Sequence, residues 1–329
     1  MKLIQILFRL LLGISLAASG FIRLADSTGT GMLVSEYLAL LGINVSGMLP
    51  LISGTALSIL EFTVGICLLM RLRLRTMSMI CLIYSIVCTV AASVMVSVFS
   101  LPVARNAVAA LMSLFLFLDA KKRPRLAPTL FEWAATASLA AFAVAIAVDS
   151  WVNIPRIDFS RYRVGSDFRH KAEQILPSCG SHLMEKYVAV SIWDISGIGE
   201  KQWDEIAMLK AVATSSQAGF VILCNEYGAP EPLEDAQVRL PANELMELLR
   251  SNGGAVLLDE GLIVYKCPAR SILGDKFAEA LIDDPDETIA EYSAGRIFFV
   301  CLCSLSLLIL LLLVHHLCKV FYCDKKKTK

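Results

Sequence analysis

Charged residues are scarce in this chain of 329 residues: Asp, Glu, Lys and Arg make up 18%, against about 25% in a typical soluble domain. Ten cysteines are too few for a disulfide scaffold. The chain has no zinc-spaced Cys/His set, phosphate-cradling glycine loop, Ser-His-Asp arrangement or basic nucleic-acid face. Apolar residues reach 56%, which excludes a single soluble domain and indicates a membrane protein with the lipid bilayer as its first partner.

Six apolar stretches are candidates for transmembrane helices, because a helix needs about 20 mostly apolar residues to cross the bilayer. They are Leu3 to Ile22, Leu49 to Met70, Thr76 to Phe99, Ala104 to Leu118, Leu130 to Val148 and Ile297 to Val320. The fourth is short for a span. We therefore predict a bundle of five spans at 1–149, an α/β domain at 150–295, and a last span with a basic tail at 296–329.

The net charge of zero hides two opposite charges. Residues 150–295 hold 13 basic and 23 acidic residues, a net of −10, and the remainder carries +10. Basic residues in short loops mark the cytoplasmic side. They cluster around alternate ends of the spans, at residues 2–9, 71–75, 121–125 and 319–329. We therefore expect both termini in the cytoplasm and the acidic domain outside, in the periplasm of a Gram-negative cell.

The first span has an alternative interpretation. Its basic start, apolar middle and small residues Ala17 and Ser19 are also features of a signal peptide cleaved before Gly20. The apolar segment is longer than the usual 7 to 15 or so residues of a signal peptide, so a retained span is favoured.

Strands and helices alternate in the acidic domain. Tyr187 to Asp194 and Gly219 to Cys224 are predicted strands, and Glu200 to Thr214 is the helix between them. A helix at 241–250 follows, and two strands at 255–259 and 262–266 flank the turn Asp259-Glu260-Gly261. This β-α-β-α-β-β order predicts a thioredoxin-like domain. The acidic segment 275–291, broken at 283–285, is expected to be a helical tether to the last span.

One carboxylate, that of Glu61, lies near the middle of a predicted span. Glu61 lies midway along the second span, where a charged side chain is costly and is retained mainly when paired, protonated or functional. Arg23 or Arg9 could pair with it. The alternative is a protonated Glu61 that bonds Ser15 or Ser19 and only fixes helix packing.

Short motifs resemble a known family. Gly20-Phe21-Ile22-Arg23-Leu24, then Glu36-Tyr37-Leu38 in a membrane-adjacent stretch, then residues 60–69 around Glu61, are similar to the DoxX/MauE-type bundle of bacterial inner membranes. Residues 154–165 and 251–261 resemble the members in which such a bundle carries a thioredoxin-like domain. The resemblance implies an accessory protein, with Glu61, Arg23 and Gly20 as the candidate cofactor-binding residues.

Two departures from that family concern redox chemistry. Relatives of the MauE type carry Cys-Gly-Cys between the third and fourth spans, where this chain has residues 98–106 without cysteine. An active thioredoxin fold needs Cys-x-x-Cys after its first main strand, where this chain reads Trp193-Asp194-Ile195-Ser196-Gly197-Ile198-Gly199. We therefore expect no dithiol exchange, no catalytic residue, no metal and no resident cofactor.

The remaining cysteines are expected to be structural. Cys179, Cys224 and Cys267 are the three of the acidic domain, and the strands that end at Cys224 and Cys267 should lie too far apart for a disulfide. Cys179 with His182 could be a nucleophile or a ligand pair, although no further cluster surrounds them. Cys81 and Cys88 share a helix face and are expected to pack as small apolar residues.

Two functions follow from the sequence. The first is an inner-membrane accessory protein that presents a redox-silent thioredoxin-like domain to a periplasmic or membrane protein partner. The second is a membrane redox subunit that handles quinone or reducing equivalents through the bundle around Glu61.

Overall fold

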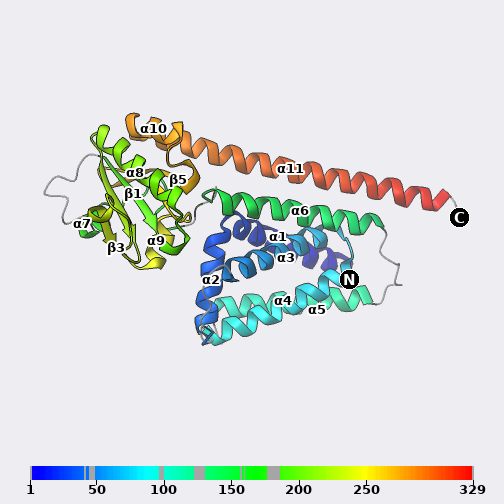
Figure 1. Ribbon diagram of the computed structural model, residues 1–329. Helices are drawn as coiled ribbons and strands as arrows, with labels where there is room; N and C mark the ends of the chain where they lie inside the picture. The colour runs from blue at the N-terminus through cyan, green and yellow to red at the C-terminus, as the bar shows by residue number, and fades with distance from the viewer. Residues whose placement is uncertain are drawn as a thin grey trace. The chain divides into compact units, whose positions relative to one another are not determined.

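The computed structural model describes residues 2–40, 42–43, 49–95, 100–121, 130–155, 158, 160–175 and 186–327. Six of its helices are long and apolar enough to cross a membrane, which confirms a multi-pass membrane protein. The chain divides into two compact units: residues 1–148 with 302–329, which we call the bundle, and residues 149–301, which we call the sheet unit (Figure 1).

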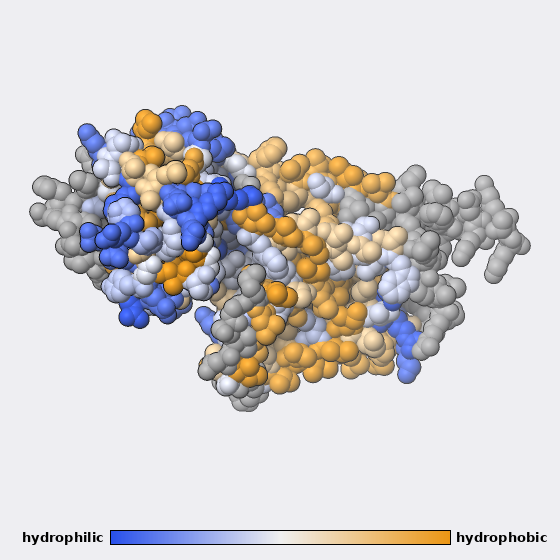
Figure 2. Space-filling model, viewed as in Figure 1, coloured by the Kyte–Doolittle hydropathy of each residue, from blue (hydrophilic) through white to orange (hydrophobic). Residues whose placement is uncertain are grey.

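The bundle consists of α1 (Lys2–Ala25), α2 (Ser27–Leu40), α3 (Leu49–Met70), α4 (Leu74–Met95), α5 (Leu101–Lys121) and most of α6 (Leu130–Val152). The fourth span is longer than expected, because α5 begins at Leu101 and runs for 21 residues. Apolar side chains of α1, α3, α4, α5 and α6 form one core. Many others, such as Leu3 and Leu111, stay exposed, as lipid-facing residues do (Figure 2).

The segment predicted to be membrane-adjacent forms α2, whose first turns pack against the start of α3. A Cβ on Gly31 would lie 2.8 Å from the Cα of Leu51. Asp26 caps this helix, since its Oδ1 accepts the Gly29 N–H at 2.8 Å. The chain therefore turns from α1 into α2 while it stays in contact with α3.

The sheet unit contains one five-stranded mixed sheet. Along the chain it has α7 (Arg169–Ile175), β1 (Lys186–Ile192), α8 (Glu200–Ser215), β2 (Gly219–Cys224), β3 (Gln237–Arg239), α9 (Ala242–Leu248), β4 (Gly254–Asp259), β5 (Leu262–Cys267) and α10 (Asp275–Ile282). The strand order is β3-β2-β1-β4-β5. Strands β1, β2 and β3 are parallel, and β4 is antiparallel to both β1 and β5.

Both faces of the sheet are covered. Strand β1 is almost wholly buried, which explains why its sequence Lys186 to Ile192 is apolar without strict alternation. One face packs against α8 and α10, and the other against α9 and Phe168 just before α7. The predicted order of strands and helices is thus confirmed, with the short edge strand β3 as an addition.

The predicted tether is different from what was expected. Helix α10 does not merely link two parts, because Phe277, Ala280 and Leu281 belong to the core of the sheet unit. The break at 283–284 is confirmed, and α11 (Pro285–Lys327) follows as one helix of 43 residues. At about 1.5 Å per residue it is about 64 Å long, roughly twice the hydrocarbon thickness. Its first turns pack in the sheet unit, where Thr288 is buried.

Candidate functional site

Two glycine contacts bring α1 and α3 unusually close together. A Cβ on Gly20 would lie 2.4 Å from the backbone nitrogen of Phe62, and a Cβ on Gly65 would lie 2.4 Å from that of Ala17. No larger residue fits at either position without separating the helices. Gly20, predicted as a cofactor contact, is therefore first of all a packing residue. It lies against Phe62, the residue that follows Glu61.

The close approach places Arg23 beside Glu61. The Arg23 Nη1 donates to Glu61 Oε2 at 2.9 Å and to the Tyr84 hydroxyl at 3.1 Å. The Glu61 side chain is 5% exposed, whereas the Arg23 side chain is 36% exposed. The Ser19 and Tyr84 hydroxyls also lie within hydrogen-bonding reach of the carboxylate. The sequence-predicted candidates are thus gathered at one place, and Arg23 is the partner of Glu61.

The other partners predicted for Glu61 were Arg9, Ser15 and Ser19. Ser19 is the serine that reaches the carboxylate. Arg9 lies two turns before Ala17 on α1, toward the opposite end of that helix, and its buried Nε has no hydrogen-bond partner among the described residues. Of the two arginines named from the sequence, Arg23 is thus the one that pairs with Glu61.

Sequence reasoning missed Tyr84. It lies on α4 between Cys81 and Cys88, at the three- and four-residue spacing that places side chains on one helix face. Cys81 Sγ lies 3.0 Å from the Ser113 hydroxyl, and the Asn106 side-chain amide donates to the Cys88 carbonyl at 3.3 Å. The shared face of Cys81 and Cys88 is therefore the sequence signal from which Tyr84 could have been found.

Chemically, this site offers hydrogen-bond donors and an ion pair whose carboxylate is buried and whose guanidinium is partly exposed. Among the residues that the structure describes, no group of three or more His, Cys, Asp or Glu side chains could hold a metal ion. The Arg23 guanidinium and the Tyr84 hydroxyl are groups that bind a carbonyl or anionic oxygen. We call Arg23, Glu61 and Tyr84 the intramembrane cluster.

The strands of the sheet have no exposed thiol among their described residues, whereas Cys301 on α11 is exposed. Cys224 and Cys267 are both buried and free, and β1 and β4 separate their strands. Burial raises the pKa of Cys224, and it raises that of Cys267 to about 12, so both thiols stay protonated at neutral pH. Cys179 and His182 lie outside the described residues.

The stretch between β1 and α8 forms a closed polar turn. Asp194 Oδ1 accepts hydrogen bonds from the Ser196 hydroxyl and N–H at 2.6 and 3.1 Å. Across from it, Asn252 Oδ1 accepts the N–H groups of Trp193 and Asp194 at 3.0 and 3.1 Å, and its amide donates to the Asp194 carbonyl at 2.7 Å. We call residues 193–199 with Asn252 the polar turn.

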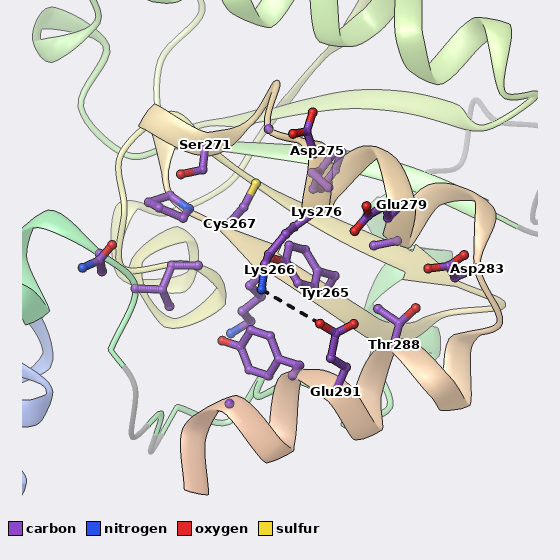
Figure 3. A pocket seen from close by; sticks show the side chains of 18 of the residues that line it. Tyr265, Lys266, Cys267, Ser271, Asp275, Lys276, Glu279, Asp283, Thr288 and Glu291 are labelled. Atoms are coloured by element: carbon purple, nitrogen blue, oxygen red, sulfur yellow. Dashed lines mark ion pairs between the residues drawn. The ribbon is translucent and has the colours of Figure 1, made fainter. Parts of the chain in front are cut away.

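A groove of about 410 Å³ opens between β5, α10 and α11 (Figure 3). The acidic residues Asp275, Glu279 and Asp283 line it together with the basic residues Lys276 and Arg296. At its rim the Lys276 Nζ and the Glu291 Oε1 lie 3.9 Å apart, and both side chains are exposed (Figure 3). Because charges of both signs line it, the groove favours no one class of ligand.

The chain has no match in three comparisons: no family model, no curated protein and no solved structure is similar to it.

Proposed function

We propose that the chain is an accessory protein of the bacterial inner membrane, of the DoxX/MauE-like type, whose bundle presents a redox-silent thioredoxin-like domain to a periplasmic or membrane protein partner. The strand order β3-β2-β1-β4-β5, with β4 antiparallel to β1 and with α8 directly after β1, supports the thioredoxin-like part. The bilayer orientation with both termini in the cytoplasm rests on the basic loops.

The polar turn is the observation that carries this proposal. It occupies the position where redox-active relatives carry two cysteines, and its polar atoms are held by Asp194 and Asn252. Such a turn has no thiolate to attack a disulfide. What remains is a surface at the end of a sheet, and binding is the function that such a surface supports.

Site-specific photocrosslinking tests the proposal on the full chain in its membrane. One probe replaces Tyr227, which is 64% exposed and precedes Gly228, where a Cβ would lie 2.7 Å from Ile195 of the polar turn. The matched control replaces Ile282, which is 79% exposed. The control lies at the opposite end of β1, where Lys186 donates to the Leu281 and Asp283 carbonyls at 3.0 Å.

We expect the probe at Tyr227 to capture one protein reproducibly and the probe at Ile282 not to capture it. Equal capture at both positions, or none at Tyr227, would contradict the proposal. Asn252→Ala should weaken capture at Tyr227, because it removes three hydrogen bonds that shape the polar turn.

The intramembrane cluster favours a second function, the handling of quinone or reducing equivalents by the bundle. Arg23, in the last turn of α1, and Tyr84, midway along α4, supply two donors beside a buried carboxylate, and part of Arg23 is exposed. Quinone carbonyls accept such hydrogen bonds. Lipid extraction of the purified protein, followed by mass analysis, tests this function. Quinone should copurify with the unaltered chain and with Thr63→Val, and should be lost in Arg23→Leu; its absence from the unaltered chain would exclude this function.

A further inference from the structure

The outer edge of β5 is covered by residue 158 and residues 160–168, which we call the strap. Residue 167 pairs with residue 262 as an antiparallel bridge. Three backbone hydrogen bonds join the two segments: Gly165 N–H to Ile263 O at 2.8 Å, Ile263 N–H to Ser166 O at 3.1 Å, and Phe168 N–H to Gly261 O at 2.8 Å. An open strand edge is a template for another chain, so the strap occupies a position that a foreign strand could take.

A buried ion pair holds the strap in place. The Lys266 Nζ of β5 donates to Asp158 Oδ2 at 2.9 Å, and the two side chains are 2% and 4% exposed. The Ser160 N–H donates to the other carboxylate oxygen at 2.8 Å. The charges of the pair are therefore out of water and compensated mainly by each other.

This arrangement makes partial loosening of the strap unfavourable. If Asp158 moved away, Lys266 would be buried without a counter-charge. Burial lowers the pKa of Lys266, and the nearby Arg250 and Arg296 lower it further, so neither of these neighbours would compensate its charge. Partial loosening would therefore cost more than the backbone hydrogen bonds it breaks, because it would also part a buried ion pair.

The strap is also tied closely to the fifth span. Val152 ends α6, and Asp158 follows six residues later, a reach of at most about 20 Å in an extended chain. On the next position of β5, Tyr265 packs against Tyr292 of α11 with ring centroids 5.6 Å apart. Lys266 therefore contacts the strap, which follows α6, and Tyr265 contacts the start of α11. Both α6 and α11 contain candidate membrane spans.

We propose that the strap is a latch on the outer edge of β5: it opens as one piece, separately from the rest of the sheet, by parting Asp158 from Lys266. Three observations support the latch. The strap covers the edge of β5, the buried ion pair joins Asp158 to Lys266, and α6 ends only six residues before Asp158. Opening bares the edge of β5 at Leu262 and Ile263, where the strap pairs with it, without disturbing β1 and β2.

Hydrogen exchange of the full chain in lipid nanodiscs, followed by mass analysis, tests this proposal. In the unaltered chain, amides of residues 163–168 should exchange at least about tenfold faster than those of β1. A disulfide between the bridge positions, in Asp167→Cys/Leu262→Cys, should slow strap exchange when oxidised and restore it when reduced, with β1 unaffected in both states.

The ion pair of Asp158 and Lys266 is tested in the same experiment. Lys266→Met should speed strap exchange further, and Asp158→Asn with Lys266→Met should return it toward the original rate, because no buried charge is then left unpaired. Strap and β1 amides that exchange at one common rate in the unaltered chain would overturn the proposal, as would an oxidised bridge that leaves strap exchange unchanged.

Discussion

Gly20 of α1 lies against the backbone of Phe62 in α3 so closely that any side chain there would meet it at 2.4 Å. The residue before Phe62 is Glu61, and one turn after Gly20 stands Arg23. The close contact between this glycine and the α3 backbone therefore brings Arg23, in the last turn of α1, within reach of Glu61.

Gly20→Ala is expected to destabilise the bundle by about 1–3 kcal/mol, since the added methyl group must push the helices apart. Gly295→Ala is the matched control, because a Cβ there has no neighbour within 4 Å. Thermal unfolding of the purified proteins in detergent measures both. A Gly20→Ala protein as stable as the control would show that α1 and α3 are not held this closely.

Glu61→Gln should leave the protein in the membrane and impair whatever the bundle does, because the glutamine cannot pair with Arg23. Arg23 would then lack its counter-charge, whereas Arg23→Gln/Glu61→Gln removes both charges and should recover much of the lost stability. Expression, unfolding temperature and copurified lipid are the measurements. If Glu61→Gln were as stable and active as the original, only a minor packing role would remain.

The Asp158 carboxylate is expected to make the sheet unit sensitive to acid. Burial alone would raise its pKa, but Lys266 and the Ser160 hydrogen bonds outweigh that effect and lower it. A lowered carboxylate pKa contributes stability above its usual value, near pH 4, and this stability is lost as the pH falls through the folded value.

Unfolding followed between about pH 3 and pH 7 should therefore show an acid-dependent loss that Asp158→Asn abolishes. Lys266 acts in the other direction, since its lowered pKa makes folding less favourable while the lysine must carry a proton. In Asp158→Asn the stability should thus rise only as the pH approaches the ordinary pKa of lysine from below. An unchanged acid profile in that variant would assign the acid sensitivity to other groups.

Cys224 and Cys267 should resist alkylation in the native protein at neutral pH, because both are buried and their pKa values are raised. Both should react fully after unfolding. A new thiol on the exposed face of α8, in Ala211→Cys, provides the positive control. Rapid labelling of Cys267 in the folded protein would contradict the position of β5 in the sheet.

The same Ala211→Cys variant tests the predicted membrane orientation. A membrane-impermeant maleimide should label Ala211→Cys in intact spheroplasts, because the acidic domain is expected outside. Cys323, in the basic tail, should be labelled only after permeabilisation. The reverse pattern would invert the topology predicted from the basic loops.

The sequence predicts those parts of the fold that depend on local patterns. Apolar runs long enough for the bilayer located the spans, and β-branched runs located β1, β2, β4 and β5. Strand β3 escaped detection because Gln237–Arg239 is short and largely polar, and is a strand only through its pairing with β2. The fourth span was predicted too short because Pro102 stands near its start and Asp119 and Lys121 near its end, although a helix tolerates proline in its first turn.

The candidate site was predictable in part. A charge inside a span requires compensation, so Arg23 could be named as a partner of Glu61 from sequence alone. Nothing local pointed to Asp158 and Lys266, because their pairing depends on how the sheet edge folds. Acidic helix α10 seemed a tether since its exposed face carries the charges, while its buried face carries Phe277 and Leu281.

The ion pair of the strap also dictates an order of events during synthesis. Asp158 and Lys266 are 108 positions apart in the chain, so at about 5–20 residues per second roughly 5 to 20 s separate their emergence. Through that interval the strap, already attached to a membrane-inserted helix, has neither its strand nor its counter-charge. The sheet edge can close only when β5 arrives, which makes this corner of the protein one of the last to fold.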